Sequence, residues 1–158
     1  MDAMTIIRRC RAAKGEIRRI RQRIAQWEEI LTNISAPQPD PIGGGRGTSD
    51  PDKAGRIMGD IDELERLAAA REEEWLAEQV AVSALLDMVP SLENEVLFLY
   101  YMSEMSTTEI ARKKKYTPGY VRKVKRNGEQ LLAMLTPERV ESTLPLWYLK
   151  KEKDRKKA

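Results

Sequence analysis

The sequence contains no histidine and only one cysteine, Cys10. A disulfide needs a second cysteine, and zinc sites built from cysteine and histidine need several such residues, so neither is expected. The side chain most often used as a general acid or base near neutral pH is also missing. We therefore expect no metal, no cofactor and no enzymatic activity. A single thiol is compatible with a reducing cytosol.

Aromatic residues and long apolar runs are also scarce. Aromatics make up 6% of the 158 residues, whereas charged residues make up 34%. Because β-sandwiches and barrels need many aromatic and β-branched residues, this composition favours an all-α protein. No run approaches the roughly 18 apolar residues of a membrane span, and Met1 to Arg9 lacks the apolar core of a signal peptide. We expect a cytoplasmic protein without a membrane partner.

The charges that are present are unevenly distributed along the chain. Residues 1–35 hold 8 Lys/Arg against 4 Asp/Glu, residues 36–106 hold 5 against 15, and residues 107–158 hold 15 against 6. The three blocks therefore carry +4, −10 and +9, which together give the net charge of +3. Such asymmetry indicates pairing within the molecule and an end that attracts anions. The last third is the candidate for binding nucleic acid.

Apolar residues recur in alternating steps of four and three along the first 35 residues. This spacing is typical of one long helix with a coiled-coil seam. A second apolar stripe follows Pro51, a residue suited to a first helical turn. The first stripe is Ile6, Cys10, Ala13, Ile17, Ile20, Ile24, Trp27, Leu31 and Ile34, and the second is Ile57, Ile61, Leu64, Ala68, Trp75, Val82, Leu86 and Val89.

The second helix is acidic on its polar face, whereas the first is rich in arginine. The acidic residues are Asp60, Asp62, Glu63, Glu65, Glu72, Glu73, Glu74 and Glu78. Antiparallel pairing would bury both stripes and place opposite charges side by side. We therefore predict that residues 1–89 form a long antiparallel helical hairpin, a coiled coil through which the chain forms a homo-oligomer or contacts RNA polymerase.

A segment rich in proline and glycine separates the two helices. Residues 35–52 read SAPQPDPIGGGRGTSDPD, with four prolines and four glycines, and are predicted to form a flexible loop. The stretch GGGRGTSD superficially resembles a phosphate-binding loop. It lacks the Lys-Ser/Thr pair and the preceding strand of such loops, so a linker is favoured.

From Pro90 the hydrophobic pattern changes to short helical units. Ser106 and Glu109 form a capping box that starts a helix, which ends within Lys113–Lys115. Thr117 caps the next helix, with Pro118 at its first position. The residues predicted to face the core are Leu92, Val96, Leu99, Tyr100, Met105, Ile110, Ala111, Val121, Val124, Gly128, Leu131, Leu132 and Leu135.

Two short helices joined by a tight turn, the second basic on its outer side, are typical of a helix-turn-helix. Residues 90–136 are therefore predicted to bind double-stranded DNA. Arg122 and Lys123 suit guanine edges, and the neighbouring residues suit phosphates. The predicted DNA-binding residues are Thr107, Thr108, Thr117, Gly119, Tyr120, Arg122, Lys123 and Arg126.

Residues 137–158 are predicted to form a docking segment and a basic tail. Thr136-Pro137 begins a short helix. Leu144, Leu146, Trp147 and Leu149 are expected to pack on the helix-turn-helix core. The final lysines are expected to form a flexible arm that attracts phosphates without sequence preference.

The stretch TTEIARKKKYTPGYVRKVKRNGEQLLAML resembles the helix-turn-helix of region four of bacterial sigma factors and, more closely, phage regulators of the RinA and ArpU type. The matching positions are Ile110-Ala111, Tyr116-Thr117 and Val121-Arg-Lys-Val124, within Leu92 to Leu135. The resemblance implies a transcriptional regulator of phage late or packaging genes in the bacterial cytoplasm, with RNA polymerase as a further partner. Two alternatives stay open: a phage small terminase subunit and a coiled-coil scaffold without DNA binding.

Overall fold

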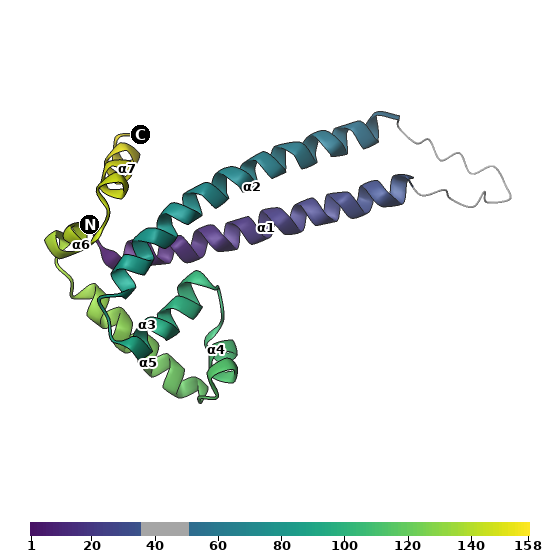
Figure 1. Ribbon diagram of the computed structural model, residues 1–158. Helices are drawn as coiled ribbons and strands as arrows, with labels where there is room; N and C mark the ends of the chain where they lie inside the picture. The colour runs from purple at the N-terminus through teal and green to yellow at the C-terminus, as the bar shows by residue number, and fades with distance from the viewer. Residues whose placement is uncertain (36–50) are drawn as a thin grey trace. The chain divides into compact units, whose positions relative to one another are not determined.

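The computed structural model describes residues 1–35 and 51–158, and every regular element in these ranges is helical (Figure 1). The all-α prediction is therefore confirmed for the described residues. No described helix is long and apolar enough to cross a membrane. The stretch GGGRGTSD lies outside the described residues. The elements are α1 (Ala3–Ser35), α2 (Pro51–Leu86), α3 (Ser91–Leu97), one π-helical turn η1 (Phe98–Met102), α4 (Thr107–Lys114), α5 (Pro118–Ala133), α6 (Pro137–Thr143) and α7 (Leu146–Lys157).

The chain divides into two compact units. Unit 1 consists of Met1–Gly15 and Glu72–Ala158, and unit 2 consists of Glu16–Arg71. Both α1 and α2 contribute to each unit, since the division falls within these two helices. The division predicted at residue 90 follows a change in hydrophobic pattern, whereas the observed units follow the packing of the helices.

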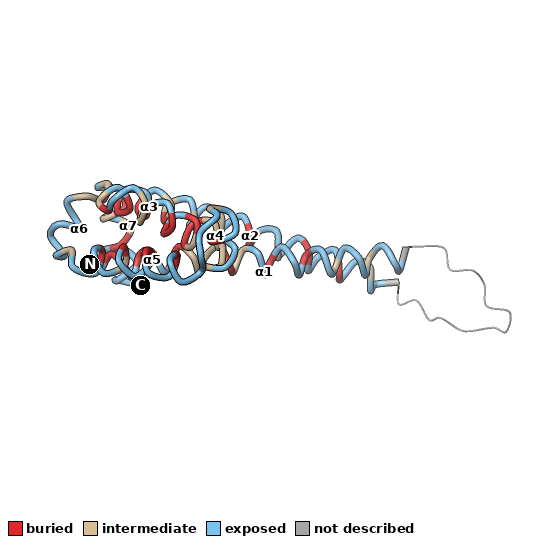
Figure 2. The backbone as a smooth tube through the Cα atoms, turned by 90° about the horizontal axis from the view of Figure 1, so that it is seen from below, coloured by how far each residue is buried: buried red, intermediate tan, exposed pale blue. Residues whose placement is uncertain are grey.

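Unit 2 has a narrow core between α1 and α2. Ile20 and Ile24 of α1 pack with Ile57, Ile61 and Ala68 of α2. The buried residues recur along both helices (Figure 2), as the predicted stripes require, but Ile34 at the end of the first stripe is 37% exposed. At the edge of this core, Arg71 Nε lies 3.1 Å from Glu16 Oε1. Trp27, Leu31 and Leu64 are partly buried and pack against this core.

Unit 1 contains the main hydrophobic core. The first turns of α1 and the last turns of α2 meet residues from α3, η1, α5, α6 and α7 there. This core explains why the two ends of the chain belong to one unit. Its fully buried large side chains are Ile6, Ile7, Val82, Leu85, Leu86, Leu97, Leu132, Val140 and Tyr148.

A second, smaller core of unit 1 joins α3, η1, α4 and α5. Its buried members are Val96, Leu99, Ile110, Ala111, Val121 and Val124, all predicted from the sequence to face inward. Gly128 lies where α5 passes close to α3. A Cβ atom at this position would lie 2.6 Å from Leu97 Cδ1 and 3.1 Å from Glu93 Cβ. Glycine therefore permits the close approach of the two helices.

The C-terminal segment differs from its prediction. The final lysines belong to α7 rather than to an irregular arm. Leu144 is buried as predicted, but Leu146 is 85% exposed and Trp147 is 49% exposed, so their predicted docking is wrong. In α7 the buried residues are Tyr148 and Glu152, one helical turn apart, because residues four apart share a helix face.

For two further residues the observed burial of the side chain is the reverse of the predicted burial. Leu131, predicted to be in the core, is 43% exposed, because Val124, Gly128 and Leu132 define the inner face of α5 in steps of four. Glu78, predicted to be on the acidic polar face of α2, is only 2% exposed. A buried carboxylate needs partners, and the partners of Glu78 come from α1 and α7.

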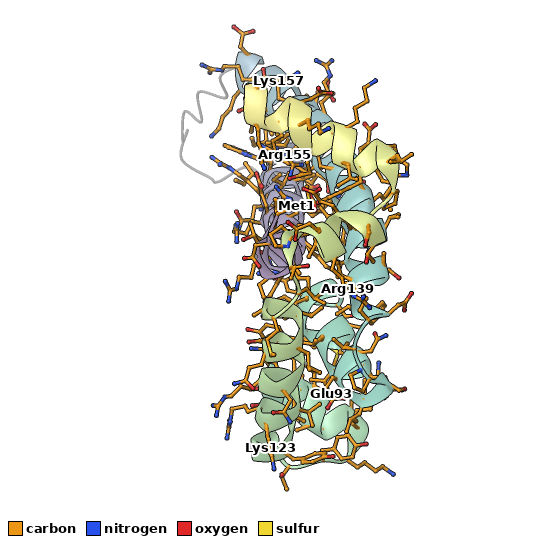
Figure 3. The ribbon with its side chains drawn as sticks, turned by 90° about the vertical axis from the view of Figure 1, so that its left-hand side faces the viewer. Met1, Glu93, Lys123, Arg139, Arg155 and Lys157 are labelled. Carbon is orange, nitrogen blue, oxygen red and sulfur yellow. The ribbon has the colours of Figure 1, made fainter. Side chains whose placement is uncertain are left out.

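Glu78 lies at the centre of an ionic cluster. The Tyr148 hydroxyl donates to Glu78 Oε2 at 2.6 Å and accepts from Arg9 Nη2 at 3.1 Å. Arg9 Nε and Arg155 Nη1 each lie 3.2 Å from Glu78 Oε1, and both arginines also pair with Glu152. Arg155 is labelled on α7 in Figure 3. These bonds tie α7 to α1 and α2, and burial together with the Glu78 bond raises the pKa of Tyr148.

Candidate nucleic-acid interface

The two short helices of the candidate interface start where the sequence predicts. Ser106 Oγ accepts a hydrogen bond from the Glu109 amide at 3.1 Å, and α4 begins at the next residue. Thr117 Oγ1 accepts from the Tyr120 amide at 3.2 Å, and Pro118 is the first residue of α5. Each cap satisfies an amide that the helix itself leaves without a partner.

The turn between α4 and α5 is tight because Lys115 adopts a left-handed conformation. Its φ is 59° and its ψ is 40°. The amides of Lys115 and Tyr116 both donate to the Ala111 carbonyl, which closes the end of α4. A left-handed residue is the common way to end a helix, and glycine usually occupies it. Only Lys115, Tyr116 and Thr117 separate the two helices.

The predicted DNA-binding residues lie at the first turn of α4, at the cap of α5 and along the N-terminal half of α5. Thr107 is partly buried, and the other seven are exposed: Thr108, Thr117, Gly119, Tyr120, Arg122, Lys123 and Arg126. Val121 and Val124 alternate with them and are buried against α3 and α4. Lys123 is labelled near the N-terminal end of α5 in Figure 3. The core thus orients the cations of α5 outward.

The structure brings the start of α4 next to the basic side of α5. Thr107, Arg122 and Arg126 line one open hollow of about 220 Å³ together with Lys125 and Glu129. At the N-terminus of α5, a Cβ atom on Gly119 would meet nothing within 4 Å. Internal packing therefore does not require glycine at position 119.

Two lysines of the basic segment are engaged within the fold. Lys114 Nζ lies 3.3 Å from Glu95 Oε2. Lys125 Nζ lies 2.6 Å from Glu129 Oε1 and 4.3 Å from the centre of the Tyr100 ring. Lys125 of α5 therefore has a carboxylate and a ring as partners within the fold, and the exposed cations of α5 are Arg122, Lys123 and Arg126.

The site predicted from the sequence omits an aromatic residue. Tyr116 is 40% exposed, and its ring packs edge to face on that of Tyr120, with the ring centres 5.2 Å apart. The pair spans the turn beside the Thr117 cap. The sequence shows Tyr116 as the aromatic residue directly before the Thr117 cap. Its spacing alone did not indicate that its ring is exposed.

No protein-family model matches the chain, and no curated protein or solved structure matches it. The local geometry therefore carries the functional argument. Within residues 1–35 and 51–158, no three His, Cys, Asp or Glu side chains come together as a metal site requires.

Proposed function

We propose that this protein binds double-stranded DNA in a sequence-specific manner through a helix-turn-helix formed by α4 and α5. One observation carries the proposal: Arg122, Lys123 and Arg126 are exposed on α5, while Val121 and Val124 fix the opposite side of the same helix in a core. A solvated basic tail would have no buried valines. In the proposal, α5 is the recognition helix and α4 crosses the DNA backbone.

The dimensions of DNA are compatible with this role. An α-helix with its side chains is about 10–12 Å across, and the major groove of B-DNA is about 12 Å wide. With the start of α5 in the groove, Arg122 and Lys123 donate to guanine O6 and N7. Arg126 and the hydroxyls of Thr107 and Thr117 contact phosphates, which set the position of the helix without reading sequence.

We further propose that the protein is a phage-encoded transcriptional regulator of late or packaging genes, acting in the bacterial cytoplasm. The resemblance of Leu92–Leu135 to region four of sigma factors and to the RinA and ArpU regulators supports this role. RNA polymerase is the further partner that such a role implies. The proposed antiparallel hairpin of α1 and α2 is supported by the shared core of Ile20, Ile24, Ile57 and Ile61.

The proposal is tested by selecting preferred sites from a pool of random duplex DNA and measuring the effect of Arg122→Ala. We expect the variant to lose about 5- to 150-fold in affinity for the preferred site, the equivalent of about 1–3 kcal/mol for a bidentate base contact. Its affinity for random DNA should change much less. Arg139→Ala, an exposed arginine on α6, is the matched control and should change neither affinity.

Two results would contradict the proposal. An equal loss on preferred and random DNA would show that Arg122 contacts only the DNA backbone. The absence of any duplex binding at low salt would favour a scaffold. Arg126→Ala provides the opposite reference, since the proposal assigns this exposed residue of α5 to a phosphate and a backbone contact weakens both kinds of DNA equally.

A further inference from the structure

We propose that unit 2 docks on a second copy of this chain through one face of α1 and α2, and that the two copies are related by a two-fold axis. The inference does not depend on DNA binding. The face, called here the Trp27 face, consists of Arg23 and Trp27 of α1 and of Asp60, Glu63, Leu64 and Leu67 of α2. These six residues line a hollow of about 410 Å³.

The first argument is the incomplete burial of unit 2. Its buried core consists of five residues, against which Trp27, Leu31 and Leu64 are only partly buried, and further large apolar side chains are left exposed. Leu67 and Ile30 are each 40% exposed, and Ile34 is 37% exposed. An apolar stripe wider than one seam is typical of helices that pack against more than one neighbour, as in a four-helix bundle.

Among the described residues of unit 2, the exposed apolar side chains of Ile30, Ile34 and Leu67 lie on or beside the Trp27 face, whereas Met58 lies on another side of α2. Ile30 and Ile34 follow Trp27 at spacings of three and seven, which places them on the same side of α1. On α2, Leu64 and Leu67 are three residues apart, and both line the hollow together with Trp27. The apolar floor of the hollow therefore continues along α1 beyond Trp27.

The charges of the Trp27 face identify the occupant as a second copy. The basic residue, Arg23, comes from α1, whereas the acidic residues, Asp60 and Glu63, come from α2. In a two-fold pair, the same patch meets itself, so residues that contact each other across the axis do so twice. Arg23 of each copy then meets Asp60 and Glu63 of the other.

Other classes of partner fit the Trp27 face less well. Nucleic acid and an anionic lipid surface would be repelled by Asp60 and Glu63. A partner of one charge sign would match the residues of one helix and be opposed by those of the other. A self-complementary patch with an apolar floor satisfies the basic and acidic residues together.

The first experiment measures the mass of the full chain by sedimentation equilibrium over a range of concentrations. We expect a dimer of twice 18.1 kDa. Leu67→Glu should raise the dimer dissociation constant at least about 100-fold, because it puts a carboxylate into the apolar part of the contact in each copy. Leu76→Glu changes an exposed leucine of α2 that belongs to unit 1, and it should leave the dimer intact. Circular dichroism checks that both variants keep their helices.

The second experiment separates contacts between copies from contacts within one copy. Arg23→Glu alone and Asp60→Lys/Glu63→Lys alone should each dimerise poorly, because like charges then meet across the axis. A mixture of the two variants should form a heterodimer at least about tenfold tighter than either homodimer, since both cross-axis contacts are again between opposite charges. Pairing within one chain would show no such recovery on mixing.

Several outcomes would overturn the inference. These are a monomeric wild-type chain, a closed ring of more than two copies, a dimer that Leu67→Glu does not weaken, or charge variants that do not recover on mixing. Failure here is distinguishable from failure of the DNA-binding proposal, because Arg122→Ala leaves the mass unchanged and Leu67→Glu leaves α5 unchanged. A monomeric Leu67→Glu chain should still bind a single half-site.

Discussion

The helix α7 is tied to the rest of unit 1 through Tyr148, and replacing this residue by phenylalanine tests the strength of that link. Tyr148→Phe keeps the buried ring and removes only the hydroxyl group. That group donates to Glu78 Oε2 at 2.6 Å and accepts from Arg9 at 3.1 Å. The variant therefore isolates the contribution of the ionic cluster from that of the hydrophobic core.

The expected size of the effect follows from what remains of the cluster. A hydrogen bond to a charged group contributes about 1.5–3 kcal/mol. In the variant, Glu78 keeps Arg9 and Arg155 as partners, so we expect the lower part of this range, about 1.5–2 kcal/mol. At about 2–4 °C per kcal/mol for a chain of this size, the melting temperature should fall by about 3–8 °C.

Thermal melting followed by circular dichroism at neutral pH measures this change. Trp147→Phe alters the neighbouring aromatic residue, which is half exposed, and should change the free energy of unfolding by less than about 0.5 kcal/mol. The folded pKa of Tyr148 lies above the ordinary value of 10.0, so the stabilisation tied to its proton is present below pH 10 and is lost at higher pH. The difference between wild type and Tyr148→Phe should therefore narrow above pH 10. Equal melting temperatures at neutral pH would refute the role of the hydroxyl.

Three further predictions concern glycine, the left-handed turn and alkaline pH. Gly59→Ala, where an added Cβ meets nothing within 4 Å, should stabilise α2 by about 0.5–1 kcal/mol. Gly128→Ala should destabilise unit 1 by about 1–3 kcal/mol, because the added Cβ would collide with Leu97. Urea unfolding measures both changes. Lys115→Gly should stabilise the fold by about 0.5–1 kcal/mol by relieving the left-handed strain, and an unchanged or lower urea midpoint would contradict this. Burial raises the pKa of Cys10 from 9.0 to about 11. The stabilisation tied to its proton is therefore present below pH 9 and is lost between pH 9 and 11. Cys10→Ala should remove this part of the pH dependence of the melting temperature.

Local signals in the sequence predicted the starts of the two short helices α4 and α5 well. The caps Ser106 and Thr117 act on their nearest amides, and Pro118 fits the first helical turn whatever the rest of the molecule does. Residues of this kind depend on neighbours within about four positions. The spacing of Val121 and Val124 then determines which side of α5 faces outward. The starts of α4 and α5 and the outward side of α5 were therefore predictable to the level of single side chains, whereas the exposure of Tyr116 was not.

Contacts between distant segments were not predictable from local patterns. Glu78 has an ordinary position among the acidic residues of α2, and its burial depends on Arg9 and Tyr148, which are 69 and 70 positions away by residue number. Helical spacing assigns faces within one helix and carries no information about which face a later helix will cover. For the same reason, Leu146 and Trp147 were predicted to be buried from the leucine-rich C-terminal segment, although Tyr148 occupies the core instead.

The structure also changes how the charge of the basic segment is interpreted. By composition, every lysine and arginine between Ser106 and Arg126 is an equal candidate for contacting an anion. Lys114 and Lys125 have carboxylate partners within the fold, at 3.3 and 2.6 Å. Each phosphate contact steepens the salt dependence of DNA binding by about 0.9 in the slope of log affinity against log salt. Lysines that already pair within the fold should therefore add little to that slope, whereas Arg126, which is exposed on α5 and assigned to a phosphate, should add close to the full amount. The arrangement of charge on α5, rather than the net charge of the segment, is what the proposed interface requires.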